Sequence, residues 1–289
     1  MKMKYNFSIV IPTKNEEKNI KACMESIFSQ KQKQIEILII DAFSSDNTVK
    51  HLKDYKNRNR KDISIKIIQK KLPAEKAIAY GIHESKGDII SFLGADDRLY
   101  NKNTLSNVSK IFKTNNEKIL YGSYLIIDEE DRPIKKVISK KFNRDDLLND
   151  GNYICATSLF FKKSIFQIIK KNIDDGYDFA FILKSSKYLK YLRTKKILSK
   201  FKIHPMSNSG NFYKNILNIK KDYIISKKYG GRKYNNYHRR YLLIKTLDLF
   251  NLLWLGELKR KISMSKLLGR NIDFKRKSVD VQERIKQKV

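Results

Sequence analysis

The run IEILIID, residues 35–41, is apolar almost throughout and ends in an acid, and the same pattern returns in IISFLGADD, residues 89–97. Strands as apolar as these are buried on both faces, which is typical of a parallel sheet covered by helices. Ligands of such sheets bind beyond the carboxyl ends of the strands. We therefore expect Asp41, Asp96 and Asp97 to meet at one rim, where carboxylates suit a ribose, a divalent metal or both.

The first hundred residues alternate between apolar strands and helical spacing. Asn15 can cap a first helix, whose apolar positions include Ile20 and Phe28, and Asp46 can cap a second helix over 47–55. Pro73 opens a third helix. The pattern predicts a doubly wound, mostly parallel α/β half. Its expected strands are 7–11, 35–40, 63–68 and 89–93.

After Asp97 the pattern is mixed, without regular alternation. A turn at 129–133 separates two strand-like runs, so we expect a hairpin, and Asp128–Asp131 are interpreted as part of that turn. A later strand ends at His204. Beyond residue 210 helix-like segments predominate. The other expected elements are helices at 104–112, 145–148 and 179–189 and strands at 119–128, 134–139, 156–161 and 197–203.

The chain is strongly basic, with a formal net charge of +32 over 289 residues. Residues 211–289 hold 21 Lys and Arg against 6 Asp and Glu, so nearly half of that charge lies in the last quarter. Three interpretations stay open: a solvated surface with codon bias, nucleic-acid binding without a recognised motif, or docking on an anionic membrane leaflet. Leu242–Leu255 is interrupted by Lys245 and Asp248, which argues against a membrane span.

Other sequence features narrow the setting and the chemistry. Cys23 and Cys155 show no zinc or disulfide spacing, and the amino terminus does not resemble a signal peptide, so we expect a cytoplasmic protein. Neither G-x-x-x-x-G-K-[ST] nor G-x-G-x-x-G occurs, which disfavours a phosphate-cradling loop.

Three blocks together resemble the opening of a family 2 glycosyltransferase: FSIVIPTKNEEKNI, EILIIDAFSSDNTV and GDIISFLGADD. The second block matches the family's D-x-x-S-x-D-x-T pattern through Asp41, Ser44, Asp46 and Thr48. The third resembles its DxD-type metal motif at the end of a strand. The resemblance extends over about residues 6–210, and later strings, YICATSLFFKKSIF, IDDGYDFAFILK and KFKIHPMSNSG, resemble the acceptor-side and late strands.

The resemblance implies a GT-A fold, a Rossmann-like and mostly parallel central sheet with flanking helices. It implies a glycosyltransferase domain over 1–210, with a nucleotide-sugar half of about 1–100 and an acceptor half of about 101–210. A basic helical region, 211–289, would follow as a C-terminal extension. It also implies Mg or Mn as the cofactor. The donor would be bound by Pro12, Thr13, Glu16, Asp41 and Asp96, and the metal by Asp97 and His204.

The resemblance does not single out one residue as the catalytic base. Relatives often carry an acid directly before Tyr-Asp, whereas this chain reads Asp174-Asp175-Gly176-Tyr177-Asp178. Gly176 therefore stands where the usual base would be, and either Asp175 or Asp178 would take the proton. A second departure is Ala79, where many relatives have Asn on the donor side.

The resulting hypothesis is inverting transfer of a sugar from a nucleotide-sugar, expected to be a UDP-sugar, to a glycan or lipid-linked acceptor in bacterial surface polysaccharide synthesis. We expect a cytoplasmic enzyme, peripheral on the inner face of the cell membrane if the basic tail docks there, and no nucleic acid as partner. Two alternatives stay open. One is a non-catalytic relative that binds nucleotide or glycan, and the other is a basic nucleic-acid-binding protein.

Overall fold

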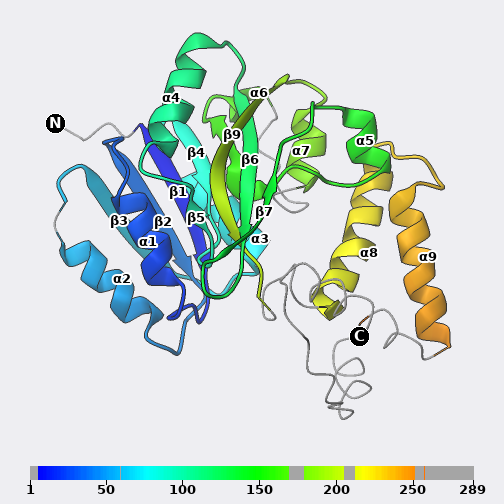
Figure 1. Ribbon diagram of the computed structural model, residues 1–289, viewed down its shortest axis with the longest axis horizontal. Coiled ribbons are helices and arrows are strands. Elements are labelled where there is room, and N and C mark those ends of the chain that lie inside the picture. Colours follow the sequence, from blue (N-terminus) through cyan, green and yellow to red (C-terminus); the bar gives the residue numbers. More distant parts are fainter. Residues whose placement is uncertain (1–5, 59, 169–178, 205–211, 251–256, 258–289) are drawn as a thin grey trace. The chain divides into compact units, whose positions relative to one another are not determined.

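A computed structural model describes residues 6–58, 60–168, 179–204, 212–250 and 257. The chain divides into a large compact unit, Met1–Lys245, and a second unit, Thr246–Val289. The first unit holds the sheet and all the elements that surround the predicted site (Figure 1).

The amino-terminal half is a parallel, doubly wound sheet, as predicted. Its strands lie in the order β3-β2-β1-β4, and every neighbouring pair among them is parallel. Every residue of β2 is buried, because helices cover both faces of the sheet. The strands are β1 (Phe7–Thr13), β2 (Ile35–Asp41), β3 (Ile63–Gln69) and β4 (Ile89–Phe92).

Alternate residues of each strand build two separate cores. Ile9 and Ile37 pack under α1 (Ile20–Phe28), α2 (Thr48–Asn57) and α4 (Thr104–Thr114). Val10 and Leu38 face the other way, toward α3 (Ala74–Glu84). The period of two in the strand side chains thus explains how one buried sheet serves both helical layers.

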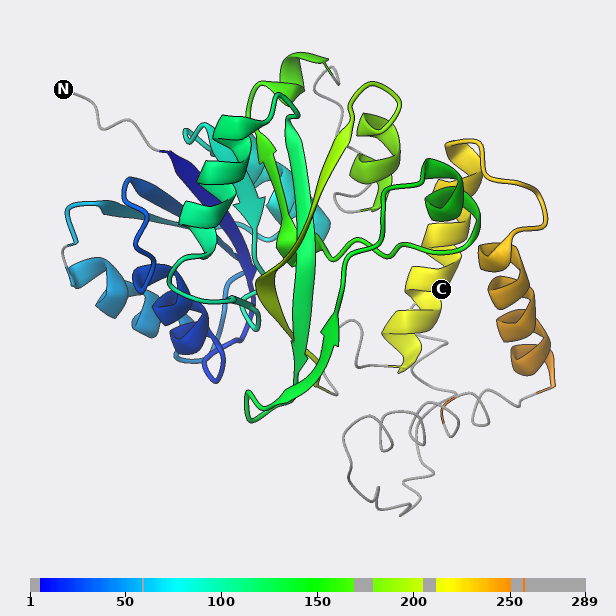
Figure 2. The same ribbon diagram turned by 45° about the horizontal axis from the view of Figure 1, so that its top comes forward.

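The second half of the sheet is mixed. It continues from β4 as β8-β6-β9-β5, with β8 antiparallel to both β4 and β6, and β9 parallel to β6. The expected hairpin is present as the antiparallel pair of β6 and β7. Figure 2 shows its tip reaching toward the end of β9. These strands are β5 (Arg98–Leu99), β6 (Ile119–Ile127), β7 (Pro133–Val137), β8 (Leu159–Lys162) and β9 (Tyr191–Lys202).

Several local expectations were wrong in detail. Asn15 does not cap α1, which begins only at Ile20; its own backbone is left-handed, with φ of 54°, in a loop before the helix. A 3₁₀ turn, η1 (Ala156–Ser158), precedes β8, which is therefore shorter than predicted. β9 is longer, because pairing with β6 carries strand geometry through a polar segment.

Short helices cover the second half of the sheet. The longer helix α8 (Phe212–Lys228) packs beside two of them, α5 (Arg144–Asn149) and α7 (Phe179–Ser185), whereas α6 (Ile165–Ile168) follows β8. The Ser226 hydroxyl of α8 donates to the Leu148 carbonyl at 2.6 Å. The compact unit therefore continues past residue 210, where we expected the catalytic domain to end.

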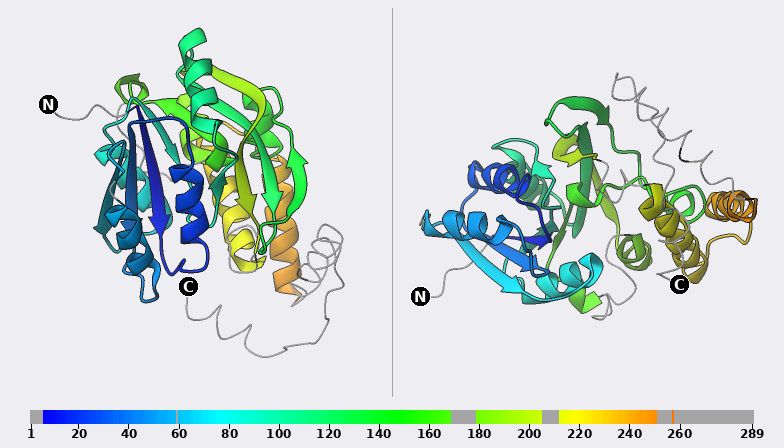
Figure 3. Two further views of the ribbon diagram at one scale, coloured as in Figure 1. Left: turned by 60° about the vertical axis from the view of Figure 1, so that its left-hand side comes forward. Right: turned by 90° about the horizontal axis from the view of Figure 1, so that it is seen from below.

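The part of α9 (Asn236–Leu249) that belongs to the first unit lies against α8 (Figures 2 and 3). Tyr223 stacks on Tyr241 between the two helices, and the Tyr237 hydroxyl donates to the Leu147 carbonyl at 3.0 Å. The extension is helical where the structure describes it, as predicted. Among the described residues, no helix has the length and apolar character to cross a membrane.

Candidate active site

A cleft of about 1500 Å³ opens at the carboxyl ends of β1, β2 and β4. The end of β9 and the tip of the β6–β7 hairpin form its other wall. A cavity of this size exceeds the roughly 300–1000 Å³ of a common ligand pocket and has room for an elongated ligand. The walls carry both acidic and basic side chains, including Glu16, Asp96, Lys71, Lys202 and His204.

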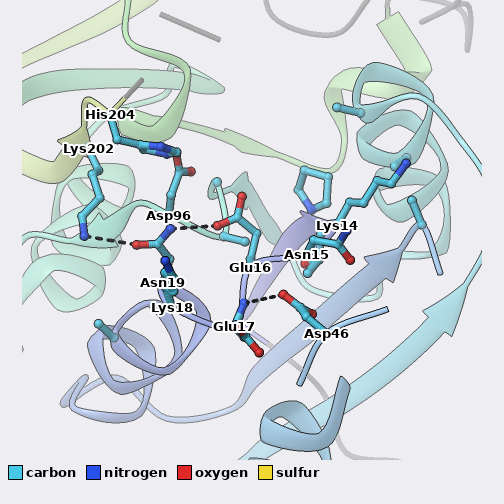
Figure 4. A pocket seen from close by; sticks show the side chains of 18 of the residues that line it. Lys14, Asn15, Glu16, Glu17, Lys18, Asn19, Asp46, Asp96, Lys202 and His204 are labelled. Atoms are coloured by element: carbon cyan, nitrogen blue, oxygen red, sulfur yellow. Dashed lines mark hydrogen bonds and ion pairs between the residues drawn. The ribbon is translucent and has the colours of Figure 1, made fainter. Parts of the chain in front are cut away.

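The loop after β1 is fastened to the loop after β2. The backbone N–H of Asn15 donates to Ser44 Oγ at 2.9 Å, and that of Glu16 donates to Thr48 Oγ1 at 2.7 Å. Figure 4 shows a third contact, from the Glu17 N–H to Asp46 Oδ2 at 3.1 Å. Asp46 also accepts from the Thr48 N–H at 3.0 Å, so it serves the start of α2 as predicted. Polar residues of the first two sequence blocks therefore join two loops of the cleft.

Three predicted donor-binding residues, Pro12, Thr13 and Glu16, line the cleft. Glu16 Oε2 accepts from Asn19 Nδ2 at 2.9 Å. Burial is the main cause that raises the pKa of Glu16, and the nearby Asp96 carboxylate adds to it. A carboxyl group held this way, beside Pro12, is placed to meet a polar ligand at the carboxyl end of β1.

Asp41 lies at the end of β2 but is fully buried and does not line the cleft, whereas its neighbours Ile40 and Ala42 do. Its carboxylate accepts from the Ser44 N–H at 3.0 Å and from Gln69 Nε2 at 3.3 Å. The donor-binding role of Asp41 stays a prediction. In this structure the residue orders the loop that begins at Ala42.

Asp96 and His204 come together, as the sequence predicted, although they lie 108 positions apart. His204 Nε2 is 3.0 Å from Asp96 Oδ2, and both line the cleft (Figure 4). The hydrogen bond with Asp96 is the main cause that raises the pKa of His204, and burial opposes it. The pair joins the end of β4 to the end of β9 at the mouth of the site.

Asp97 is only 3% exposed and is not among the residues that line the cleft. Its Oδ1 accepts the backbone N–H of Lys202 at 2.9 Å. Burial is the main cause that raises the pKa of Asp97 well above its usual range, and the Asp96 charge raises it further. The second oxygen, Oδ2, lies on the side of Gly94, which does line the cleft.

Gly94 marks a point on which both carboxylates converge. A Cβ added there would lie 2.6 Å from Asp96 Oδ1 and 2.6 Å from Asp97 Oδ2. Carboxylate oxygens gathered around one point fit a hard cation such as Mg²⁺ or Mn²⁺. The like-charge repulsion between Asp96 and Asp97 is what such an ion would relieve.

The protein side chains do not complete such a site by themselves. In the described part of the chain, no group of three or more His, Cys, Asp or Glu side chains is placed to hold a metal ion. A Mg-type site commonly takes one or two carboxylates and completes its shell with substrate phosphates and water. Asp96 and Asp97 fit that incomplete kind of site, and the metal-binding role of His204 stays a prediction.

Two candidate bases cannot be placed. Asp175 and Asp178 lie outside the described residues, and their role stays a prediction.

The sequence interpretation missed three polar residues that hold the cleft wall together, Arg98, Asp131 and Lys202. Arg98 directly follows the acid motif, which was a usable signal, whereas Asp131 looked like an ordinary turn residue.

Curated glycosyltransferases resemble this chain in sequence. The chain is 28% identical over 225 residues to a UDP-Glc:alpha-D-GlcNAc-diphosphoundecaprenol beta-1,3-glucosyltransferase, WfgD of Escherichia coli, covering 73% of this chain and 83% of that one. It is 30% identical over 164 residues to a dolichyl N-acetyl-alpha-D-glucosaminyl phosphate 3-beta-D-2,3-diacetamido-2,3-dideoxy-beta-D-glucuronosyltransferase of Methanococcus voltae, covering 55% of this chain and half of that relative.

Solved structures share the fold at low identity. Staphylococcus aureus TarS 1–349 in complex with UDP-GlcNAc aligns with a TM-score of 0.56 at 17% identity, over 74% of this chain and 66% of that one. The mannosyltransferase PcManGT from Pyrobaculum calidifontis, in complex with GDP-Man and Mn²⁺, aligns at 0.60 with 12% identity, over 84% and 69%. These likenesses confirm the GT-A fold.

A family profile matches most of the sheet and the cleft. The profile described as Glycosyl transferase family 2 matches residues 8–189, which include β1 to β8, the acid motif of Asp96 and Asp97, and the hairpin. Together with the acid rim and the fold, this match shows that the chain is a glycosyltransferase that belongs to glycosyl transferase family 2.

Proposed function

We propose that this enzyme transfers a sugar from a UDP-sugar to a lipid-linked acceptor in bacterial surface polysaccharide synthesis, with inversion at the anomeric carbon and with Mg²⁺ or Mn²⁺ as cofactor. The observation that carries the proposal is the convergence of Asp96 and Asp97 on Gly94 beside His204, at the carboxyl rim of a parallel sheet. The names of relatives support the donor and acceptor classes, since one names UDP-Glc and a diphosphoundecaprenol-linked sugar.

The chemistry explains why acids gather at a site for an anionic donor. When the bond from the anomeric carbon to the diphosphate breaks, negative charge collects on the diphosphate oxygens. A helix amino terminus offers only about half an elementary charge against it. A divalent cation held at Asp96 and Asp97, with donor phosphates and water as its other ligands, would supply a larger offsetting charge. Without one, these carboxylates would repel the donor.

The protein's own groups would bind and orient the donor. Pro12, Thr13 and Glu16 line the part of the cleft next to β1, where the nucleoside would lie, with Asp41 ordering the loop beneath. Asp96 would hold nucleotide and sugar close to the acceptor side. The placement of Pro12, Thr13, Glu16 and Asp96 around one cleft supports the proposal for these four residues.

The acceptor hydroxyl must lose a proton as its oxygen bonds to the anomeric carbon. A carboxylate suits this step, because it takes the proton while the new bond forms. We propose Asp175 or Asp178 for this role, on the strength of the sequence alone. Separate Asp175→Asn and Asp178→Asn variants would identify the base, since only loss of the true base should abolish turnover while leaving UDP binding intact.

We also propose that the enzyme works in the cytoplasm, peripherally on the inner membrane face. On α9, Leu242 and Leu243 are exposed, Leu243 by 59%, and Arg239, Arg240 and Lys245 lie among them. Each basic residue near anionic lipid contributes about 1 kcal/mol. Sedimentation with vesicles containing phosphatidylglycerol, but not with neutral vesicles, would support this location. If the protein sediments with neither kind of vesicle, the proposed location is wrong.

The decisive experiment is donor turnover. The protein is incubated with Mn²⁺ or Mg²⁺ and a panel of UDP- and GDP-sugars, and release of the nucleoside diphosphate is measured with and without a polyprenyl-diphosphate-linked sugar as acceptor. We expect release from one UDP-sugar that stops when EDTA is added. If no nucleoside diphosphate binds or is released, the proposed reaction is wrong.

Two other functions are separated by the same materials. A non-catalytic relative, suggested by Gly176, would bind UDP without turnover under every condition. A nucleic-acid-binding protein, suggested by the net charge of +32, would show salt-sensitive DNA or RNA binding that survives Asp97→Asn. We call the pair of Asp96 and Asp97 carboxylates that converge on Gly94 the acid cradle. The family membership and this acid cradle favour sugar transfer over both alternatives.

A further inference from the structure

Asp131, at the tip of the β6–β7 hairpin, pairs with two buried cations from different parts of the chain. Its two oxygens each accept from Arg98 Nη2 at 2.8 Å, and Oδ1 also lies 2.8 Å from Lys202 Nζ. The side chain of Arg98 is 8% exposed and that of Lys202 is 5% exposed. Cations this deeply buried need an anion, because burying an unpaired charge is costly.

Both cations also hold the acid motif. Arg98 Nη1 donates to the backbone carbonyl of Asp96 at 2.8 Å, and the backbone N–H of Lys202 donates to Asp97 Oδ1 at 2.9 Å. Arg98 and Lys202 come from the paired strands β5 and β9, in which Arg98 lies opposite Lys200. A single residue therefore separates Asp131 from each acid of the motif: Arg98 lies between Asp131 and Asp96, and Lys202 lies between Asp131 and Asp97.

The same contacts reach the loop after β1. Lys202 Nζ donates to Asn19 Oδ1 at 3.1 Å, and Asn19 Nδ2 donates to Glu16 Oε2 at 2.9 Å (Figure 4). Lys202 Nζ also donates to the Glu129 carbonyl of the hairpin at 2.9 Å. One lysine thus joins the hairpin, β9 and the donor loop, and its two-residue spacing from His204 places both at the same end of β9.

We propose that Asp131 is a positioning residue of the transfer reaction: by neutralising and orienting Arg98 and Lys202, it holds the Asp96–Asp97 motif and His204 in register across the cleft. This inference rests on the proposed function. The turn of the hairpin serves this role, since Asp131 takes a left-handed backbone, with φ of 64°, that turns its side chain to the two cations.

The hairpin offers a matched control. Arg132 forms the other ion pairs of the same turn, at 2.7 Å to Asp128 and 2.8 Å to Glu130, and makes no described contact with Arg98 or Lys202. Arg132→Gln therefore loosens the hairpin without touching the positioning contacts. If hairpin stability were all that mattered, Arg132→Gln and Asp131→Asn would impair turnover alike.

Asp131→Asn keeps the size of the side chain and removes its charge. We expect turnover at saturating donor to fall about tenfold or more, as for other residues that orient ligand groups from behind, with the acceptor KM unchanged. Asp131→Glu should recover most of the rate, and Arg132→Gln should stay within about twofold of the wild type. Rates are taken at 25 °C per folded molecule, with folding checked by circular dichroism.

Lys202→Met provides a second variant, because it removes one cation and leaves the Arg98–Asp131 pair charge-balanced. It should also lower turnover, and the loss in the double variant with Asp131→Asn should be smaller than the product of the two single losses, since both changes break the Lys202–Asp131 pair. Multiplied losses in the double variant would indicate independent damage and would overturn the proposal, as would wild-type turnover of Asp131→Asn or equal loss in Arg132→Gln.

A crystal structure of Asp131→Asn or, if that variant does not fold, of Lys202→Met tests the inference without any transfer assay. The proposal expects the 3.0 Å contact between His204 and Asp96 to be lost. If that contact and the hydrogen bond from the Lys202 N–H to Asp97 both persist, Asp131 does not position the site. This result is independent of whether the wild-type protein releases UDP, so failure of the positioning role is distinguishable from failure of the proposed reaction.

Discussion

Gly94→Ala is the sharpest test of the acid cradle. The new Cβ would lie 2.6 Å from one oxygen of Asp96 and 2.6 Å from one of Asp97, well inside ordinary van der Waals contact. The carboxylates cannot simply swing away, because Asp96 pairs with His204 and Asp97 accepts from the Lys202 N–H. At least one ligand oxygen must therefore move by roughly half an ångström or more, to restore a contact of about 3.2 Å.

Displacements of this size are expensive for catalysis, since a misplacement of about 1 Å can lower a rate about 100-fold. We expect Gly94→Ala to lower metal-dependent UDP release between about 10-fold and 100-fold and to raise the Mn²⁺ concentration needed for half-maximal rate. Gly94 does not have a left-handed backbone, so alanine should not strain the main chain there, and the overlap with the carboxylates should cost about 1–3 kcal/mol of stability.

Gly81→Ala is the matched contrast. Its Cβ would overlap the side chain of Val10, which lies in the buried core beneath α3 and does not line the cleft. Overpacking of this kind costs about 1–3 kcal/mol of stability and leaves the rate per folded molecule unchanged. Urea denaturation and UDP release on both variants separate the two effects. Wild-type rate and metal requirement in Gly94→Ala would refute the cradle.

Three further predictions concern two hydrogen bonds and one thiol. Tyr55→Phe removes the hydroxyl that donates to Glu25 at 2.7 Å and holds the pKa of Glu25 below its usual value. We expect the free energy of unfolding, measured by urea denaturation at pH 7, to fall by about 1 kcal/mol. This loss should shrink as the pH falls and Glu25 is protonated, because a lowered folded-state pKa stabilises the protein only above that pKa. Thr48→Val leaves the Glu16 N–H without its acceptor and should cost about 1–3 kcal/mol by the same measurement; an unchanged midpoint would show that another group replaces it. Cys155 is half-buried, and desolvation raises the pKa of its thiol to about 11, so a thiol reagent at pH 8 should label it far more slowly in the native protein than in urea; equal rates would contradict the raised pKa.

The parallel half of the fold was predictable because its signals are local. Strands such as Ile35–Asp41 are apolar without interruption, and helices follow with a period near four. The mixed half was less predictable. β9 extends back to Tyr191 through a polar stretch, since its pairing with β6 supplies hydrogen bonds that no local pattern indicates.

The candidate site, like the fold, was predictable only in part from the sequence. Asp96 could be predicted to lie at the rim because it follows a strand, and His204 because the family resemblance assigned it a late strand. The convergence on Gly94 could not be predicted, since it depends on side-chain placement within a turn. Asp131 was missed because a turn acid is usually solvated, and its partners Arg98 and Lys202 lie 33 and 71 positions away.

The distribution of charge around the cleft follows from one physical requirement. In the proposed reaction, the acid motif must hold a cation, yet the site must also admit an anionic donor. Arg98 and Lys202 line the cleft and place positive charge beside the acids, and Asp131 pairs with both of these cations. Because Lys202 also bonds Asn19, the donor loop is tied to the same balance. A change of charge at Asp131 should therefore alter the donor side of the reaction before it alters the acceptor side.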